Sequence, residues 1–327
     1  MYVGSFPADR GLAVGRVDPD TAELRMTGTV ADVPDVSFLA FAQNRQVLYA
    51  TSEQEPDGSV TALNIADPER PEVLGRQPTK GAAPTHLSVH TSGRFLLTAN
   101  YGSGTVVVHP LEPSGEIGAA SDLATLGGHA HQVLTDPSGR WVLAADLGTD
   151  TVHVLRLDLS DGSLAPRSRL GLPDGSGPRH VAFHPFGRHV YILGERRPEI
   201  TVAAWDPAGG RLDPGQVVPI AAPGETFPAE ILACRDGRFL YVSNRGANTI
   251  LVFAVHDAGA RLVPAGTAPT GGDWPRHCTL SPDEQWIYVA NQHSGTVTRL
   301  PRDPSTGGLG AAGDPVPVTN PAVILFH

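Results

Sequence analysis

Residues 177–195 read GPRHVAFHPFGRHVYILGE, and the pattern of this segment recurs along the chain. Two short apolar runs with β propensity flank a turn cluster at His184–Arg188, a pattern typical of an antiparallel hairpin. In such a hairpin the start of the first strand lies beside the end of the second. Arg179, His180 and Glu195 should therefore meet at one end of it, although they are about fifteen residues apart in sequence.

The same hairpin recurs along the chain at a nearly constant interval. When six copies are aligned on the residue after the turn, successive copies lie 46–50 residues apart, and the aligned residues are Arg45, Arg94, Arg140, Arg188, Arg238 and Gln285. A third strand-like run follows each hairpin, as at 102–111 and 246–255, and a weaker polar segment follows that, as at 210–220. A repeat of this length with four strands is typical of a β-propeller.

The two ends of the chain supply the parts of a seventh unit. Residues 320–327 (NPAVILFH) have the pattern of a first strand, and residues 1–6, 11–17 and 22–30 have the pattern of the other three. We therefore predict an all-β fold, a seven-bladed β-propeller with four-stranded blades and one blade shared by the N- and C-termini. Residues 1–327 would form a single domain. A β-solenoid or two sandwiches is the alternative, but a strict period with one shared unit favours a closed ring.

Composition excludes several classes of partner. The 327 residues carry a formal net charge of −10, which argues against a nucleic-acid partner or an anionic membrane surface. No apolar run approaches the roughly 18 residues of a membrane helix, and the N-terminus lacks the pattern of a signal peptide. We expect a cytoplasmic protein, a monomer or weak homodimer. Cys234 and Cys278 are in no CxxC motif and are expected to be small buried residues.

Aligned positions of the repeat predict what lines one mouth of the channel, because the first strand of each blade is innermost. Nine residues before the aligned position the chain has Val36, Thr85, His131, Arg179, Ala229 and Arg276. The next residues are Ser37, His86, Gln132, His180, Glu230 and His277. The end of the second strand adds Thr51, Asn100, Asp146, Gly194, Asn244 and Asn291, followed in two blades by Glu195 and Arg245.

This collection of unlike polar residues is the strongest functional signal in the chain. Buried arginines on one rim are costly unless an anion or a paired carboxylate is present, so we predict functional roles for Arg179, Arg276, Glu195 and His131. A second set could bind substrate or make hydrogen bonds between blades: His86, His180, His277, Glu230, Arg245, Asn100, Asn244 and Asn291. Other histidines fall on turns or outer strands and are expected to be solvated or in local contacts: His90, His109, His153, His184, His189, His256 and His293.

No metal or cofactor is predicted at this mouth. Three histidines in one aligned position could bind zinc only if adjacent blades brought each nitrogen to about 2 Å from the metal, and a wide mouth argues against that. The chain has no G-x-S-x-G motif, no P-loop and no dinucleotide fingerprint after a strand.

With these residues in hand, the chain resembles the lactonase family of seven-bladed propellers. This family includes bacterial propeller-type 6-phosphogluconolactonase and fungal carboxy-muconate lactonizing enzyme. The resemblance extends over nearly the whole chain, and its motifs lie at residues 2–6, 84–106, 129–133, 177–195, 237–250 and 320–327. The chain departs from the family pattern at FAQNRQ (41–46), which lacks a Pro/Gly turn, and at Gly194, where asparagine is common.

The resemblance implies specific residues and a reaction. The family's functional His, Arg and Glu fall on His131, Arg179 and Glu195, and a further arginine falls on Arg276 or, second, on Arg245. The implied reaction is metal-independent hydrolysis of a sugar-acid lactone such as 6-phosphogluconolactone, a step of the pentose phosphate pathway.

In that reaction Arg179 and Arg276 would hold the anionic substrate or the oxyanion. Glu195 or His131 would activate water, and the other would orient or protonate the leaving oxygen. The same residues would serve reversible lactonization of a muconate-like diacid. A propeller that only binds a small anion or a protein partner is a third possibility, because folds host many functions.

Overall fold

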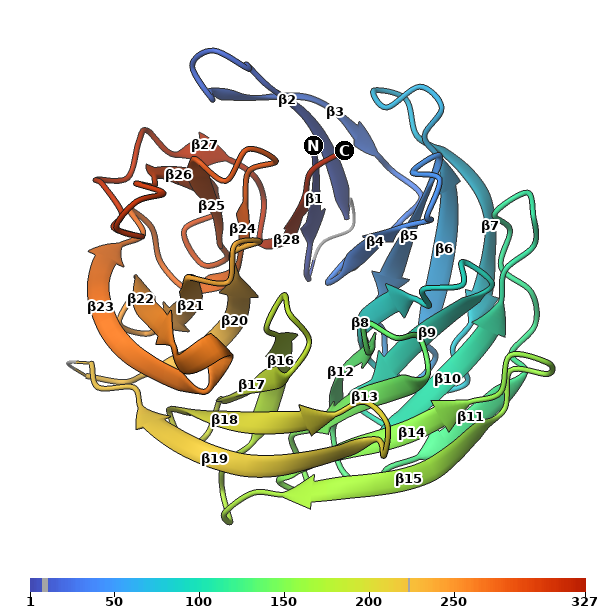
Figure 1. The fold of residues 1–327 in the computed structure, drawn as a ribbon. Helices are drawn as coiled ribbons and strands as arrows, with labels where there is room; N and C mark the ends of the chain where they lie inside the picture. The colour runs from blue at the N-terminus through green and yellow to red at the C-terminus, as the bar shows by residue number, and fades with distance from the viewer. Residues whose placement is uncertain (8–10, 223) are drawn as a thin grey trace.

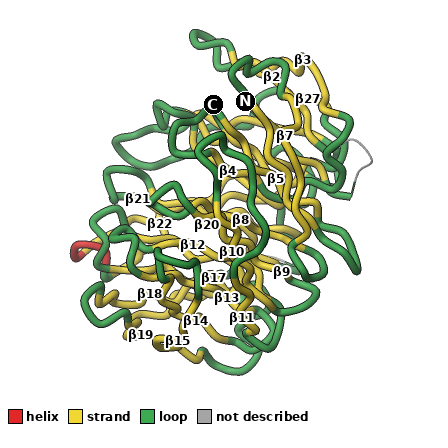
Figure 2. Tube along the Cα trace, turned by 90° about the vertical axis from the view of Figure 1, so that its right-hand side faces the viewer, coloured by secondary structure: helices red, strands yellow, loops and turns green. Residues whose placement is uncertain are grey.

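The computed structural model describes residues 1–7, 11–222 and 224–327. The described residues form seven four-stranded antiparallel sheets arranged in a ring (Figure 1). Strands and loops make up nearly all of the structure in Figure 2, and the short helical segment is the 3₁₀ turn η1 (Asp257–Gly259). The predicted seven-bladed propeller is confirmed.

The shared blade closes the ring. Its strands are, from the channel outward, β28 (Pro321–Leu325), β1 (Tyr2–Ser5), β2 (Leu12–Val17) and β3 (Leu24–Val30). Figure 1 shows the two chain ends beside each other, with red β28 next to blue β1, and Val3 lies opposite Ile324 in their pairing. The blade assembled from both termini is therefore confirmed.

The six remaining blades follow in chain order, each from its innermost strand outward. The first three comprise β4 (Leu39–Phe41), β5 (Val47–Ser52), β6 (Ser59–Asn64) and β7 (Glu72–Pro78); β8 (Pro84–Val89), β9 (Phe95–Asn100), β10 (Thr105–Pro110) and β11 (Asp122–Thr125); and β12 (Ala130–Thr135), β13 (Trp141–Asp146), β14 (Thr151–Leu157) and β15 (Leu164–Gly171). The last three comprise β16 (Pro178–Phe183), β17 (His189–Gly194), β18 (Glu199–Asp206) and β19 (Arg211–Pro219); β20 (Phe227–Ala233), β21 (Phe239–Arg245), β22 (Thr249–His256) and β23 (Arg261–Pro269); and β24 (Pro275–Leu280), β25 (Trp286–Asn291), β26 (Thr296–Pro301) and β27 (Val316–Pro317).

The core lies between neighbouring sheets rather than within one. One apolar cluster joins Leu143 and Val154 of one blade to Val190, Ile192 and Trp205 of the next. Because each sheet is covered on both faces, its second strand is buried along its whole length in most blades. This explains why the second strands read as continuous apolar runs instead of alternating ones.

A repeated hydrogen bond fastens each of several blades to the next. A tyrosine of the second strand donates its O–H to a backbone carbonyl in the outer turn of the following blade, in the pairs Tyr2–Pro68, Tyr49–Gly115, Tyr191–Gly259, Tyr241–Gly307 and Tyr288–Ala22. The turn glycine is required by space as well as by conformation. A Cβ on Gly307, which has φ +73°, would lie 2.3 Å from the ring of Phe239.

Three of the histidines expected to be solvated or in local contacts are buried, and each contacts a neighbouring blade. His90 Nε2 lies 2.9 Å from Gly139 O, His184 Nε2 lies 3.2 Å from Gly237 O, and His109 Nε2 lies 3.2 Å from Pro78 O. Solvation is thus wrong for these three, because the neighbouring blade covers each ring and supplies its partner. Cys234 and Cys278 are buried free thiols, as expected. Within the described ranges no helix has the length and apolar character needed to cross a bilayer.

Candidate active site

A β-bulge places the polar residues of the inner strands. Four inner strands shift register across a single residue, and the residues at these shifts are Thr85 in β8, His131 in β12, Arg179 in β16 and Arg276 in β24. A bulge adds one residue to one strand and re-aims its side chain. The aligned position that the repeat singled out is therefore the bulge, which explains why the side chain at that position, and not those of its neighbours, lines the pocket.

These residues meet in one pocket at the end of the channel where the inner strands begin. The cavity has a volume of about 160 Å³ and is lined by Glu53, Thr85, Tyr101, His131, Arg179, Glu195, Arg245 and Arg276. A water molecule occupies about 30 Å³ in the liquid, so the pocket has room for a small organic molecule. Eight side chains of the described residues, from six blades, converge on it, and all four residues predicted to be catalytic are among them.

Glu195 holds two arginines together. Its Oε2 lies 3.0 Å from Arg179 Nε and 3.1 Å from Arg245 Nη2. Burial disfavours the ionised carboxyl, but Arg245 and Arg179 outweigh burial and lower the pKa of Glu195 below its ordinary value. Burial also lowers the pKa of the Arg179 guanidinium to about 9, so that it still carries its charge at neutral pH. The paired carboxylate that buried arginines require is thus Glu195.

Backbone carbonyls of β20 fix the two guanidinium groups in place. Arg179 Nη1 donates to Ala229 O, and Arg245 Nε donates to Phe227 O at 3.0 Å. The Arg245 guanidinium also lies 5.4 Å from the centre of the Trp274 ring, a cation–π distance. Both groups are therefore held before any ligand arrives, as electrostatic preorganisation requires.

The third arginine has a different partner. Arg276 Nη2 lies 3.5 Å from Glu53 Oε2, and its guanidinium lies 5.5 Å from the centre of the Phe6 ring. Burial raises the pKa of the Glu53 carboxyl against the opposing effect of Arg276. Among the described residues the pocket lining has three arginines and two carboxyl groups, which leaves an excess of positive charge for an anionic group or an oxyanion.

His131 provides a neutral imidazole on the pocket wall. Burial, followed by the charge of Arg179, holds the pKa of His131 well below its ordinary value. Its Nδ1 is buried without a hydrogen-bond partner among the described residues. The ring is therefore unprotonated at neutral pH and can accept a proton.

Four residues of the predicted set form a buried layer next to the pocket instead of lining it: His86, His180, Glu230 and His277. Glu230 bridges two of these rings, with Oε1 3.0 Å from His180 Nδ1 and Oε2 3.4 Å from His277 Nε2. The N–H of Ile324 donates to His277 Nδ1 at 3.3 Å, so the proton of the neutral ring lies on Nε2 and faces Glu230. The His180 ring lies 5.1 Å from the ring of His131.

The buried layer packs against the pocket wall, because the ring of His180 lies next to the ring of His131. Burial lowers the pKa of His277 to about 4 and raises that of Glu230. Direct contact between this layer and substrate stays a prediction for which the pocket lining gives no support.

The three asparagines lie elsewhere in the blades. Asn100 Nδ2 lies 3.0 Å from Thr105 Oγ1, Asn291 Nδ2 lies 2.9 Å from Thr298 Oγ1, and Asn244 Nδ2 lies 3.5 Å from Thr226 Oγ1. All three are fully buried, and none belongs to the described pocket lining. The structure therefore gives them hydrogen bonds that join strands and turns within a blade, and their binding of substrate stays a prediction that the pocket lining does not support.

Glu53, Tyr101 and Thr85 line the pocket but were not among the predicted site residues. Tyr101 occupies the same repeat position as Glu195 and Arg245, and Thr85 the same position as His131 and Arg179, so the alignment contained both. Glu53 lies one residue beyond the aligned positions, in the hairpin that lacks a Pro/Gly turn. In the part of the chain that the structure describes, no group of three or more His, Cys, Asp or Glu residues is placed to hold a metal ion. Metal independence stays a prediction.

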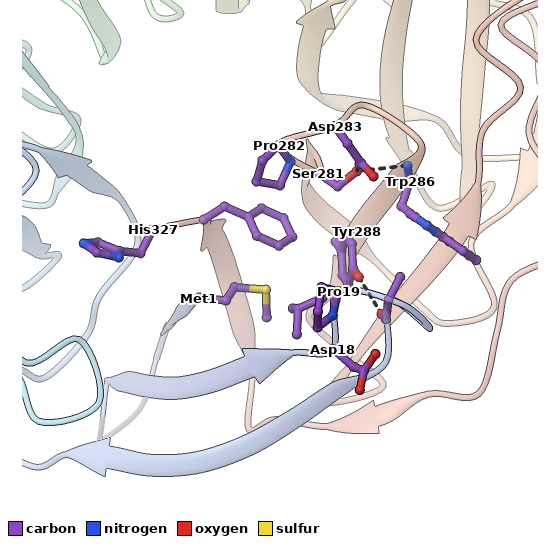
Figure 3. A pocket seen from close by; sticks show the side chains of 12 residues that line it. Met1, Asp18, Pro19, Ser281, Pro282, Asp283, Trp286, Tyr288 and His327 are labelled. Atoms are coloured by element: carbon purple, nitrogen blue, oxygen red, sulfur yellow. Dashed lines mark hydrogen bonds between the residues drawn. The ribbon is translucent and has the colours of Figure 1, made fainter.

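A larger cavity, about 360 Å³, lies between the shared blade and the blade of β24–β27 (Figure 3). Aromatic and apolar side chains dominate its wall, including Trp286, Tyr288 and Phe326. Its carboxylates serve local turns, since Asp18 accepts the N–H of Thr21 at 2.9 Å and Asp283 accepts the N–H of Gln285 at 3.1 Å. No arginine or lysine is among its described lining residues. The channel pocket is therefore the candidate active site.

Comparisons with known proteins agree with this geometry. The family model described as "Lactonase, 7-bladed beta-propeller" matches residues 1–326. A 6-phosphogluconolactonase of Bacillus subtilis is 30% identical over 342 aligned positions, which cover 99% of this chain and 97% of the relative. A 6-phosphogluconolactonase of Formosa agariphila is 27% identical, with 94% of each chain covered. Among solved structures, a periplasmic gluconolactonase of Pseudomonas aeruginosa superposes with a TM-score of 0.92 at 29% identity, covering 98% of this chain and 97% of the other.

The seven-bladed ring, the pocket at its mouth and a family match over nearly the whole length lead to one conclusion. The chain belongs to the lactonase family of seven-bladed β-propellers.

Proposed function

We propose that this lactonase hydrolyses a sugar-acid lactone of the gluconolactone or 6-phosphogluconolactone type in the channel pocket. The observation that supports the proposal best is the convergence of Arg179, Arg245 and Arg276 with His131 and Glu195 in one small cavity. The relatives named above are lactone hydrolases, so ring opening by water is the reaction for which we assign roles. A cytoplasmic location and a monomeric or weakly dimeric state stay predictions.

Arginines would stabilise the charge that develops on the lactone carbonyl. Water adds to the carbonyl carbon, the ring C–O bond breaks, and the ring oxygen leaves as a hydroxyl. The oxyanion that forms in between is the group that fixed cationic donors favour. Arg179 and Arg276 come from two inner-strand bulges and lie on the pocket wall. A δ-lactone already opens slowly in water, so orientation and charge stabilisation can supply most of the acceleration.

His131 is the better candidate for the base that activates water. Glu195 Oε2 already contacts two guanidinium groups, so this oxygen is not free to take a proton from water. His131 is neutral and its Nδ1 has no described partner. A general base must be unprotonated and within reach of the water, and His131 meets the first condition at neutral pH. Glu195 then acts by positioning the arginines.

The test is lactone hydrolysis by the purified protein, followed by acid release and corrected for spontaneous opening. Arg179→Ala should lose about 10²–10³-fold in kcat while circular dichroism stays unchanged. Arg211→Ala is the control, because Arg211 is exposed and pairs with Asp213 on the surface. Near-normal turnover by a folded Arg179→Ala variant would contradict the proposal. Comparing δ-gluconolactone with its 6-phosphate measures the phosphate preference.

A further inference from the structure

The pocket contains a second carboxylate, Glu53, which the roles above leave unused. Glu53 follows β5, and its side chain is only 9% exposed. Its backbone N–H donates to the carbonyl oxygen of Asp35 at 2.9 Å, which fixes the segment that bears it. Its Oε2 is buried and has no hydrogen-bond partner among the described residues. The nearest cation, Arg276 Nη2, is 3.5 Å away, which is long for a direct hydrogen bond.

The environments of the two pocket carboxylates differ sharply. Glu195 contacts two guanidinium groups at 3.0 and 3.1 Å, whereas Glu53 has one at 3.5 Å. The charged groups that face Glu53 are Arg276 from β24, Arg179 from β16 and Asp35 from the segment before β4. Burial is the largest influence and raises the pKa of Glu53, and Asp35 adds to it. Arg276, a hydrogen bond with Ser37 and Arg179 oppose it, in that order. When the environments of two carboxyl groups shift their pKa values in opposite directions, one group can stay ionised while the other holds a proton.

Ring opening needs such a proton. The ring oxygen would otherwise leave as a sugar alkoxide, a poor leaving group. The guanidinium groups of Arg179 and Arg245 are already engaged with Glu195 and with backbone carbonyls of β20. A neutral carboxyl group is a suitable acid near neutral pH. Among the described lining residues, Glu53 is the carboxyl group not already bound by two cations.

We propose that Glu53 is the general acid that protonates the ring oxygen as the ring C–O bond breaks. This inference rests on the proposed lactone hydrolysis. The proton of Glu53 becomes the hydroxyl proton of the sugar acid, and the proton that water loses goes to His131. Transfer of that proton through solvent from His131 back to Glu53 restores both groups, so the cycle needs no further reactant.

The experiment measures kcat and KM for δ-gluconolactone as a function of pH, with spontaneous hydrolysis subtracted, for the wild type, Glu53→Gln and Glu55→Gln. Glu55 is the matched control, because it is an exposed glutamate two residues further along. Glu53→Gln should lose about 10²-fold or more in kcat with little change in KM. Because the acid must be protonated, wild-type kcat should fall as pH rises through the pKa of Glu53, and the variant should lack that alkaline fall. Glu55→Gln should behave like the wild type.

The other outcomes contradict either the acid role of Glu53 or the proposed lactone hydrolysis. If the wild type hydrolyses the lactone and Glu53→Gln keeps its kcat and alkaline fall, Glu53 is not the acid. A variant with raised KM and unchanged kcat also removes the acid role, because the residue then contributes only to binding. If Glu53→Gln does not fold, Glu53→Asp decides, because a displaced alkaline fall supports the role and an unmoved one rejects it. A wild type that opens no lactone refutes the proposed function itself.

Discussion

Replacing Glu195 with glutamine tests the central electrostatic feature of the pocket. The substitution keeps the shape of the side chain but removes the charge that lies 3.0 Å from Arg179 Nε and 3.1 Å from Arg245 Nη2. The Arg179 side chain is 3% exposed, so solvent cannot replace the lost partner. Two guanidinium groups would then repel each other in a buried site.

The expected loss of stability can be worked out from these distances. At an effective dielectric constant of about 20, each contact near 3 Å contributes roughly 5 kcal/mol of gross attraction, most of which offsets the desolvation of the charges. Removing one partner of a buried pair typically costs about 3–5 kcal/mol. Because Glu195 is 23% exposed, we expect the lower end, about 3 kcal/mol. At roughly 2 °C per kcal/mol for a chain of this size, Tm should fall by about 6 °C.

A surface ion pair of nearly equal length is the matched control. Arg211 Nη2 lies 2.9 Å from Asp213 Oδ2, and both side chains are more than half exposed. Asp213→Asn should therefore cost less than about 1 kcal/mol. The comparison separates the effect of burial from the effect of distance.

Thermal unfolding at several pH values, with and without added phosphate, is the assay. Because the pKa of Glu195 is lowered in the folded state, its stabilising contribution is present above its unfolded pKa and is lost as pH falls through the folded pKa. The Tm difference between the wild type and Glu195→Gln should therefore shrink below about pH 4.5. An anion bound in the pocket beside the two arginines should stabilise the variant more than the wild type, by about 2.7 kcal/mol at one hundred times its Kd. An unchanged Tm at pH 7 would refute the reasoning.

Two further predictions concern stability. Tyr288→Phe removes the O–H that donates to Ala22 O across the junction with the shared blade, so urea unfolding should show a loss of about 1–3 kcal/mol with unchanged kcat. An unaltered urea midpoint would show that this bond does not fasten the ring. Burial lowers the pKa of His109 from 6.5 to about 4. Between these two pH values the unfolded chain therefore binds a proton that the folded protein does not. The free energy of unfolding of the wild type should consequently fall as pH drops from about 6.5 to 4. His109→Gln should make that slope shallower by up to about 1.4 kcal/mol per pH unit, and an identical slope in the two proteins would contradict the assignment.

The repeat by itself predicts the ring of blades and the mouth of the central channel at which the candidate site lies. Hairpins at a constant interval place equivalent positions at equivalent points of each blade, and this alone predicts that His131, Arg179, Arg276, Arg245 and Glu195 lie at one mouth. The apolar second strands and the strand pattern at both ends predicted the closure between β28 and β1.

Pairing between side chains was decided only by the tertiary structure. Glu195 contacts Arg179 and Arg245, whereas Arg276 pairs with Glu53, and these choices depend on side-chain directions over a few ångströms that a period of nearly fifty residues cannot resolve. Asn100 lies one residue before Tyr101, which has the repeat position of Glu195, but the Asn100 side chain is fully buried against Thr105. Strand order follows from local patterns along the chain, while the contacts of a bulged or loop residue depend on neighbours that are distant in sequence.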